Sequence, residues 1–433
     1  MVPLFARYLT ALEQTQWLPR SKLVAYQQDL MRRIARHAYD NVPFYRDRLA
    51  GLFAGGDEAD LARWNEIPIL TRTEAMAHVA EMRPPSLPGM FGTPVETRTS
   101  GSTGVPLPIA FDQLTLVAAN AALTRLARWW GADVSRPLAS IRLHATEPPP
   151  YPEGRHHKGW SYACRESESH EFDIKRPVEQ QIEWLLRQRA PYWRTSASNS
   201  SAIAYAVTPA QAKALGVELI FAITETVFPR TREIVRERLG ARIAAIYSCE
   251  EIGYIATQCP VAPVYHVVAE NAWVEILRED GAPAAPGEIG QVVITGFYNY
   301  AMPFIRYAIG DVATAGPDTC ACGRSLPVIA QVEGRSRYAF VFKDGTRIWP
   351  KLWELDIGPF LSCREFQLAQ IDHERIEFRY VPHDAGDAVD AAGLSAYLRR
   401  KLHPSADIAL VPMERIPRGR GGKLEPFVSA VAD

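Results

Sequence analysis

A short run of hydroxyl and glycine residues has the composition of an anion-binding loop. Residues 97–106 read Thr-Arg-Thr-Ser-Gly-Ser-Thr-Gly-Val-Pro. Glycine lets the backbone approach a ligand closely, and successive backbone N–H groups form a concavity that binds anions. A Gly-Lys-Ser/Thr sequence does not follow, so the run is not a Walker A loop. Taken alone, it fits either a phosphate cradle or an ordinary turn, because Ser, Thr and Gly are also turn residues.

Four cysteine and histidine residues in the second half of the chain have the ligand types that zinc prefers. They are Cys259, His266, Cys320 and Cys322. Three thiolates and one imidazole nitrogen form a common tetrahedral structural zinc site. The spacing differs from that of paired Cys-x-x-Cys motifs. Unrelated buried thiols and a core histidine are therefore the alternative interpretation.

The composition is that of a globular protein with more than one domain. The chain has 433 residues, of which 47% are hydrophobic and 22% charged. A net charge of −1 predicts neither a nucleic-acid partner nor an anionic membrane surface. The first twenty or so residues lack the features of a signal peptide. We therefore expect a cytosolic protein, in which clustered cysteines indicate metal binding or catalysis rather than disulfides.

Hydrophobic periodicity predicts that helices alternate with strands over the first part of the chain, which is typical of α/β layers. The helical segments are 22–50 (broken at Asn41-Val-Pro43), 113–131, 177–190 and 228–239, and the buried strands are Leu219–Ala222 and Ile243–Ile246. Residues 145–160 are rich in Pro, His and Gly, and this composition predicts a loop.

The pattern changes beyond residue 267, where alternating apolar residues predict strands. Ala272–Leu277 and Gln291–Thr295 alternate, and a domain boundary is expected near Gly334-Arg335. Further strands around 364–381, a helix at 392–402 and a glycine-rich loop at 418–423 predict a small α+β unit of ordinary domain size. The predicted fold class is α/β, with a large multi-layer N-terminal domain (1–335) and a small C-terminal α+β domain (336–433).

Five ordered segments resemble motifs of the adenylate-forming superfamily, which includes acyl-CoA synthetases, peptide-synthetase adenylation domains and luciferases. The segments are Thr99-Ser-Gly-Ser-Thr-Gly104, Tyr247-Ser-Cys-Glu-Glu251, Ile305-Arg-Tyr-Ala-Ile-Gly-Asp311, Glu333-Gly-Arg335 and Pro417-Arg-Gly-Arg-Gly-Gly-Lys423. Asn41-Val-Pro-Phe-Tyr45, after an amphipathic helix, is typical of the phenylacetate–CoA ligase and coenzyme F390 synthetase branch. The chain departs from the family pattern at Ser248 and Glu250, and it lacks the frequent lysine after the phosphate loop.

The resemblance implies a role for each matching residue. The ATP phosphates are expected on Thr99, Ser100, Gly101, Ser102, Thr103 and Gly104, and the rest of the nucleotide on Tyr247, Asp311 and Arg335. Asp311 would accept hydrogen bonds from the ribose, and Glu251 would bind Mg²⁺, which prefers oxygen ligands. Lys423 would reach the α-phosphate and the substrate carboxylate. The small domain would rotate about residues 335–337 to bring this lysine in and out.

The implied activity is ATP-dependent activation of a small carboxylic acid, aryl or arylacetic by default. The acid would form an acyl-adenylate with release of pyrophosphate, and CoA would then accept the acyl group. An amine, a hydroxyl or a carrier-protein thiol is the alternative acceptor. A catalytically silent binding protein on the same fold is the alternative of another class.

The resemblance also bears on the metal site, because zinc-bearing members of the branch contain a similar Cys…His and Cys-x-Cys-Gly arrangement. It favours structural zinc at Cys259, His266, Cys320 and Cys322. A homodimer is the expected oligomeric state. Three roles stay open: His144 and His156 fit a substrate pocket, with an exposed loop as the alternative for His156. Arg306 fits either a phosphate or a structural carboxylate.

Overall fold

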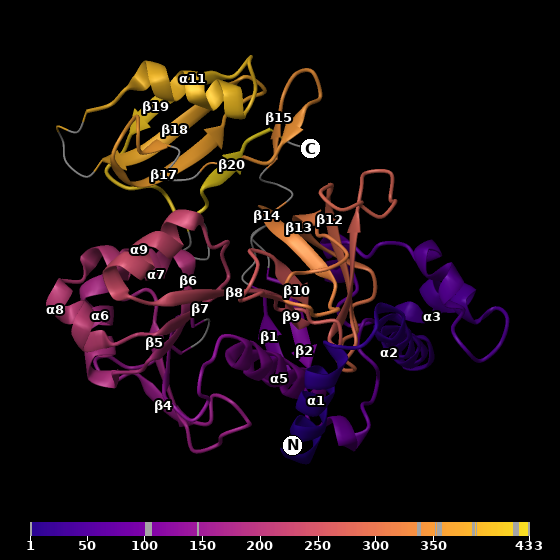
Figure 1. Ribbon diagram of the computed structural model, residues 1–433. Helices are drawn as coiled ribbons and strands as arrows, with labels where there is room; N and C mark the ends of the chain where they lie inside the picture. The colour runs from indigo at the N-terminus through magenta and orange to yellow at the C-terminus, as the bar shows by residue number, and fades with distance from the viewer. Residues whose placement is uncertain are drawn as a thin grey trace.

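The computed structural model describes residues 2–99, 106–144, 147–335, 339–350, 352, 357–382, 386, 388–418 and 424–431 (Figure 1). A twelve-stranded sheet forms the core of the large domain, and a four-stranded sheet forms that of the small C-terminal domain. The predicted α/β fold with a small C-terminal domain is confirmed. In these residues, every helix is too short or too polar to cross a bilayer.

Half of the large sheet is parallel and deeply buried. Its parallel strands are β3 (Leu138–Arg142), β5 (Glu168–Asp173), β6 (Tyr192–Ser196), β7 (Leu219–Ile223) and β8 (Arg242–Cys249). Strand β7 reads Leu-Ile-Phe-Ala-Ile, the continuous apolar run expected where helices cover both faces of a parallel sheet. One face carries four helices (Figure 1), which are α6 (Val178–Gln188), α7 (Ala197–Ala206), α8 (Pro209–Leu215) and α9 (Pro229–Leu239).

The other face of this half packs against α5 (Gln113–Trp129). The helix begins at Asp112, whose carboxylate accepts a hydrogen bond from the Thr115 backbone N–H at 2.9 Å, as N-caps do. Helix α1 (Val2–Thr15) lies against α5, and buried Phe5, Leu9 and Leu12 line the contact. Two buried charges tie these elements to the sheet, because Arg125 Nη1 lies 2.9 Å from Glu270 Oε1.

The second half of the sheet is antiparallel. Its strands, from β8 outward, are β9 (Gly253–Gln258), β10 (Tyr265–Val267), β14 (Val328–Arg335), β13 (Tyr307–Ala315), β12 (Ile289–Gly296) and β11 (Ala272–Leu277). The sheet therefore changes from parallel to antiparallel at β8, which pairs with β7 in one sense and with β9 in the other.

An N-terminal segment of one long helix and several short ones packs on the antiparallel half. Its helices are α2 (Arg20–Asn41), α3 (Tyr45–Leu49), α4 (Arg72–Ala77), η1 (Ala50–Phe53), η2 (Leu61–Glu66) and η3 (Gly89–Phe91). Helix α2 ends at Asn41, as the following Val-Pro sequence predicts. The antiparallel strands β1 (Val95–Arg98) and β2 (Pro108–Phe111) then lie on either side of the predicted phosphate loop.

The small domain has its own sheet and hydrophobic core. Its elements are β15 (Phe340–Val341), β16 (Arg347–Ile348), β17 (Cys363–Gln370), β18 (Arg375–Pro382), α11 (Ala391–Lys401), β19 (Asp407–Pro412) and β20 (Phe427–Ser429). Strands β15 and β16 pair with each other in a short antiparallel hairpin. Buried Leu394 and Leu398 of α11 pack into the core of the four-stranded sheet. This domain lies beside the end of β14 (Figure 1).

The predicted helices and strands named above correspond to α2 with α3, α5, α6, α9, α11, β7, β8, β11, β12, β17 and β18. The loop predicted for 145–160 is wrong in part, because Arg155–Lys158 forms edge strand β4, antiparallel to β5. The residues of β4 are polar and mostly exposed, and backbone pairing with β5 holds the strand, with Arg155 opposite Glu171 and Lys158 opposite Glu168. A hydrophobic pattern could not reveal it.

Candidate functional site

The carboxyl end of β8 brings one predicted nucleotide residue to the centre of the large domain. Ligands of α/β proteins bind at this edge of the parallel strands. The hydroxyl of Tyr247 donates a hydrogen bond to Asp311 Oδ2 at 2.8 Å. Burial and the negative charge of Asp311 both hold the pKa of Tyr247 well above its ordinary value, so the phenol keeps its proton and acts as a donor.

Arg335, another residue predicted to bind the nucleotide, also contacts Asp311. Asp311 on β13 and Arg335 on β14 are cross-strand partners. Arg335 Nε lies 3.1 Å from Asp311 Oδ1, and its Nη1 donates to the Ile309 carbonyl at 2.7 Å. The structure thus brings Tyr247, Asp311 and Arg335 together. A buried carboxylate oriented by two donors can accept hydrogen bonds from the hydroxyl groups of a ligand.

Glu251 lies in the turn between β8 and β9 and is also buried. The Tyr307 hydroxyl donates to its Oε1 at 3.1 Å, and the Asn299 side-chain amide donates to its backbone carbonyl at 3.4 Å. Burial and the charge of Glu251 raise the pKa of Tyr307 above its ordinary range. A fixed carboxylate of this kind is a suitable oxygen ligand for Mg²⁺ beside phosphate groups.

Thr99 opens the predicted phosphate loop and is held at its base. Its backbone N–H donates to the Leu107 carbonyl at 3.0 Å, and the Leu107 N–H donates to Thr99 Oγ1 at 3.0 Å. These two bonds join the ends of the loop beside β1 and β2. The predicted residues Ser100, Gly101, Ser102, Thr103 and Gly104, and the predicted Lys423, lie outside the described residues.

Arg72, at the start of α4, is a site residue that the sequence did not reveal. Its Nη2 donates to Thr99 Oγ1 at 2.8 Å, and its Nη1 lies 3.9 Å from Glu251 Oε1. The only local signal in this segment is that of a helix start, with Thr71 as the N-cap and Glu74 three residues later. In the structure the Thr71 hydroxyl accepts a hydrogen bond from the Glu74 backbone N–H. Nothing in that signal marks the arginine between them as a neighbour of Glu251.

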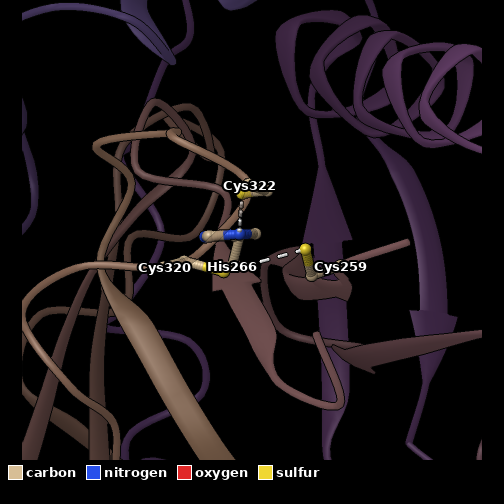
Figure 2. Close-up of side chains that lie close together, drawn as sticks. All are labelled: Cys259, His266, Cys320 and Cys322. Atoms are coloured by element: carbon tan, nitrogen blue, oxygen red, sulfur yellow. Dashed lines mark hydrogen bonds between the residues drawn. The ribbon is translucent and has the colours of Figure 1, made fainter. Parts of the chain in front are cut away.

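The four predicted metal ligands lie together, although they come from separate segments (Figure 2). Their ligand atoms all lie within 4.8 Å of one another. Cys259 Sγ is 3.8 Å from Cys320 Sγ, and His266 Nε2 is 3.1 Å from Cys322 Sγ. Two thiolates that each lie about 2.3 Å from a tetrahedral zinc are about 3.8 Å apart. The donor set and this sulfur–sulfur distance therefore fit zinc.

The surroundings favour the ligand form of the histidine. Burial lowers the pKa of His266 to about 4, so the imidazole is neutral and its nitrogen lone pair is available. Nε2 faces the Cys322 sulfur, 3.1 Å away.

Arg306, whose partner the sequence left open, forms a structural ion pair. Its Nη2 lies 3.1 Å from Glu275 Oε1, and both side chains are almost completely buried. Its Nη1 donates to the carbonyls of Asn65 and Ile67 at 2.8 and 2.6 Å. Arg306 therefore fixes the N-terminal segment on the antiparallel sheet.

The two histidines whose roles the sequence left open lie toward the β4 edge of the large sheet. His144 follows β3, and burial together with the charge of Arg142 lowers its pKa. His156 lies on edge strand β4, with its Nδ1 2.6 Å from Nδ1 of His170. His156 is thus exposed, but it lies on a strand rather than in a loop. Neither contact indicates a role in binding.

Comparisons with known proteins show what this chain resembles. No protein-family profile matches the sequence. The chain is 24% identical over 458 aligned residues to the phenylacetate-coenzyme A ligase of Thermus thermophilus, and the alignment covers 95% of this chain and 97% of that protein. Over nearly its whole length the chain therefore resembles the phenylacetate–CoA ligase branch of the adenylate-forming superfamily.

Solved structures of adenylate-forming enzymes share the fold. A 2-hydroxyisobutyryl-CoA ligase in the postadenylation state, in complex with an acyl-AMP, has a TM-score of 0.76 at 16% identity, covering 96% of this chain and 91% of that chain. The anthranilate CoA ligase AuaEII in complex with anthranoyl-AMP has a TM-score of 0.57 at 13% identity, covering 76% and 65%. Both structures thus share the fold of this chain, the first over nearly its whole length.

Proposed function

We propose that the chain is an AMP-forming carboxylate–CoA ligase. The observation that carries this proposal is the shared geometry of Tyr247, Asp311 and Arg335 at the centre of the large domain, near buried Glu251. Motifs that are far apart in the sequence meet there in a superfamily whose solved members bind acyl-AMP. A silent binding protein would not need to keep this set together.

In the proposed first half-reaction, a carboxylate oxygen of the acid attacks the α-phosphorus of ATP. The bond between the α-phosphorus and the bridging oxygen breaks, and pyrophosphate leaves with the electron pair. The protein's contribution is positioning and charge stabilisation. Asp311 accepts hydrogen bonds from the ribose, Thr99–Gly104 binds the phosphates, and Lys423 neutralises the charge that develops near the α-phosphate.

Mg²⁺ neutralises phosphate charge when it is bound, and Glu251 is the residue proposed to hold it. Tyr307 orients this carboxylate through the 3.1 Å hydrogen bond from its hydroxyl. Because Glu251 is buried, its charge has few competing water contacts and acts strongly on a nearby cation.

In the second half-reaction, the CoA thiol loses its proton to solvent and its sulfur attacks the acyl carbon, and AMP leaves with the former carboxylate oxygen. The curated relative is a phenylacetate ligase, which supports an arylacetic or aryl acid and CoA as acceptor. We propose that the small domain, residues 336–433, rotates about residues 335–337 between the two steps. The related 2-hydroxyisobutyryl-CoA ligase was solved both in the postadenylation state and in the thioesterification state.

We further propose that Cys259, His266, Cys320 and Cys322 bind structural zinc. Such a metal would join the loop after β9 and strand β10 to the turn before β14. It would hold the antiparallel half of the sheet rather than take part in the reaction. A cytosolic location and a homodimer stay predictions.

The test of the proposed function is pyrophosphate release from ATP and Mg²⁺ with a panel of aryl and arylacetic acids, each with and without CoA. We expect release with at least one acid and formation of its CoA thioester. Release followed by AMP formation only with added amines or carrier protein would favour the alternative acceptor. Absence of release with every acid, from folded protein, would favour a binding protein.

A further inference from the structure

The guanidinium of Arg72 lies between the two parts of the predicted phosphate and metal site. One of its nitrogens donates to the Thr99 hydroxyl at 2.8 Å, and another lies 3.9 Å from the Glu251 carboxylate. The second distance is too long for a hydrogen bond, although the charges still attract one another. By contrast, the structural pair of Arg306 and Glu275 is in direct contact at 3.1 Å.

The backbone places Arg72 there through long-range contacts. The Leu70 N–H donates to the Arg306 carbonyl at 2.8 Å, and the Ala308 N–H donates to the Leu70 carbonyl at 2.9 Å. Leu70 thus forms an isolated parallel bridge with Tyr307, whose hydroxyl holds Glu251. The start of β13 therefore positions both Arg72, through Leu70, and the Glu251 carboxylate, through Tyr307.

Arg306 fixes the chain immediately before this bridge by binding the Asn65 and Ile67 carbonyls. The Arg306–Glu275 ion pair, the carbonyl contacts of Arg306 and the Leu70–Tyr307 bridge thus fix the chain just before Arg72. The partly exposed guanidinium of Arg72 is held beside Thr99 in this way. The planar guanidinium of an arginine is well suited to phosphate, because two of its N–H groups, arranged as a fork, can donate to two phosphate oxygens at once.

From this geometry we propose that Arg72 is a phosphate-binding residue of the nucleotide site. With no nucleotide bound, its charge offsets that of Glu251; when ATP enters, its guanidinium contacts the oxygens beyond the α-phosphate. This inference rests on the proposed function, since it assumes that Thr99 and Glu251 face the ATP phosphates. It goes further by assigning an arginine from the N-terminal segment to the pyrophosphate portion of ATP.

The contrast between ATP and AMP tests this assignment without any acid substrate. Arg72→Met removes the charge and keeps a long side chain, whereas Arg72→Lys keeps the charge and removes the fork. Titration calorimetry of the full chain with ATP and Mg²⁺ should show an affinity about ten- to a hundredfold lower for Arg72→Met, given the strength of charge-assisted hydrogen bonds. AMP affinity should change by no more than about twofold, and Arg72→Lys should lie between wild type and Arg72→Met for ATP.

Arg63→Met is the matched control, because Arg63 belongs to the same segment but pairs with Glu66 at the surface. It should bind both nucleotides like wild type. Equal ATP affinity in wild type and Arg72→Met, or a parallel loss of ATP and AMP affinity, would overturn the inference. If Arg72→Met does not fold, the ATP-to-AMP affinity ratio of Arg72→Lys decides: an unchanged ratio contradicts the assignment.

Failure of the proposed function gives a different result. Wild-type protein that binds neither ATP nor AMP would overturn both the adenylation proposal and the role of Arg72. Wild-type protein that binds both nucleotides, with ATP affinity insensitive to Arg72, would overturn the inference alone.

Discussion

Asp311 and Arg335 face one another across strands β13 and β14, with Arg335 Nε 3.1 Å from Asp311 Oδ1. The second carboxylate oxygen accepts a hydrogen bond from Tyr247 at the end of β8. One buried carboxylate is therefore oriented by residues from two other strands. We propose that this fixed position would let the carboxylate discriminate a ligand with two neighbouring hydroxyl groups from one without them.

Replacing this carboxylate by an amide should weaken nucleotide binding. We expect Asp311→Asn to reduce AMP affinity by about tenfold or more, because hydrogen bonds to a charged acceptor are worth about 1.5–3 kcal/mol. Calorimetric titration with AMP measures the change. Asp318→Asn, on an exposed loop that follows β13, is the control and should bind AMP normally. Wild-type affinity in Asp311→Asn would remove the ribose role.

Lys423 is predicted to act in the reaction and not in nucleotide binding. Lys423→Ala should reduce the rate of pyrophosphate release by about a hundredfold or more, since it removes charge stabilisation in the transition state. ATP affinity should stay nearly intact. Single-turnover kinetics together with ATP titration separate the two effects, and Lys213→Ala on α8 serves as the control. An unchanged rate would show that Lys423 is not the catalytic lysine.

The metal proposal predicts about one zinc per chain in protein purified without chelator. Cys320→Ser should lose most of the zinc and lower the melting temperature by several degrees, because the metal joins two separate segments. Cys363→Ser, on β17 and outside the cluster, should keep its zinc and its melting temperature. Mass-spectrometric metal analysis and thermal unfolding provide the data. Zinc-free protein whose melting temperature does not respond to chelator would argue against the site.

The buried pair Arg125–Glu270 predicts an asymmetric effect on stability. Glu270→Ala should lower the free energy of unfolding by about 3–5 kcal/mol, because it leaves the Arg125 charge buried without its carboxylate. Arg125→Met combined with Glu270→Leu should recover much of this loss, since neither charge is then buried. Denaturant unfolding of the three proteins tests the prediction. A double variant as unstable as Glu270→Ala would contradict it.

The sequence was most informative where local pattern and burial agree. Helix α5 and strand β7 could be predicted because apolar periodicity, a cap or a continuous apolar run determine them locally. Strand β4 could not, because its exposed polar residues show no apolar alternation and only backbone pairing with β5 holds it. Helix α1 went unrecognised because its short apolar stripe is completed only by packing on α5.

The same distinction holds for the candidate site. Asp311, Glu251 and the cysteine cluster lie in recognisable motifs, so the sequence alone could name them. Arg72 and Tyr307 become neighbours of Glu251 only through the bridge between Leu70 and Tyr307, which joins segments more than two hundred residues apart. No local pattern encodes such a contact. The partner of Arg306, Glu275, was open for the same reason.

The central claim is that the acid is activated as an acyl-adenylate, and the path of its oxygen tests this most directly. Phenylacetate or another accepted acid, labelled with oxygen-18 in its carboxylate, is incubated with the protein, ATP, Mg²⁺ and CoA. If the carboxylate attacks the α-phosphorus, mass spectrometry will find one labelled oxygen in the phosphate of AMP. Unlabelled AMP, or label in inorganic phosphate with ADP as the nucleotide product, would contradict the adenylate mechanism.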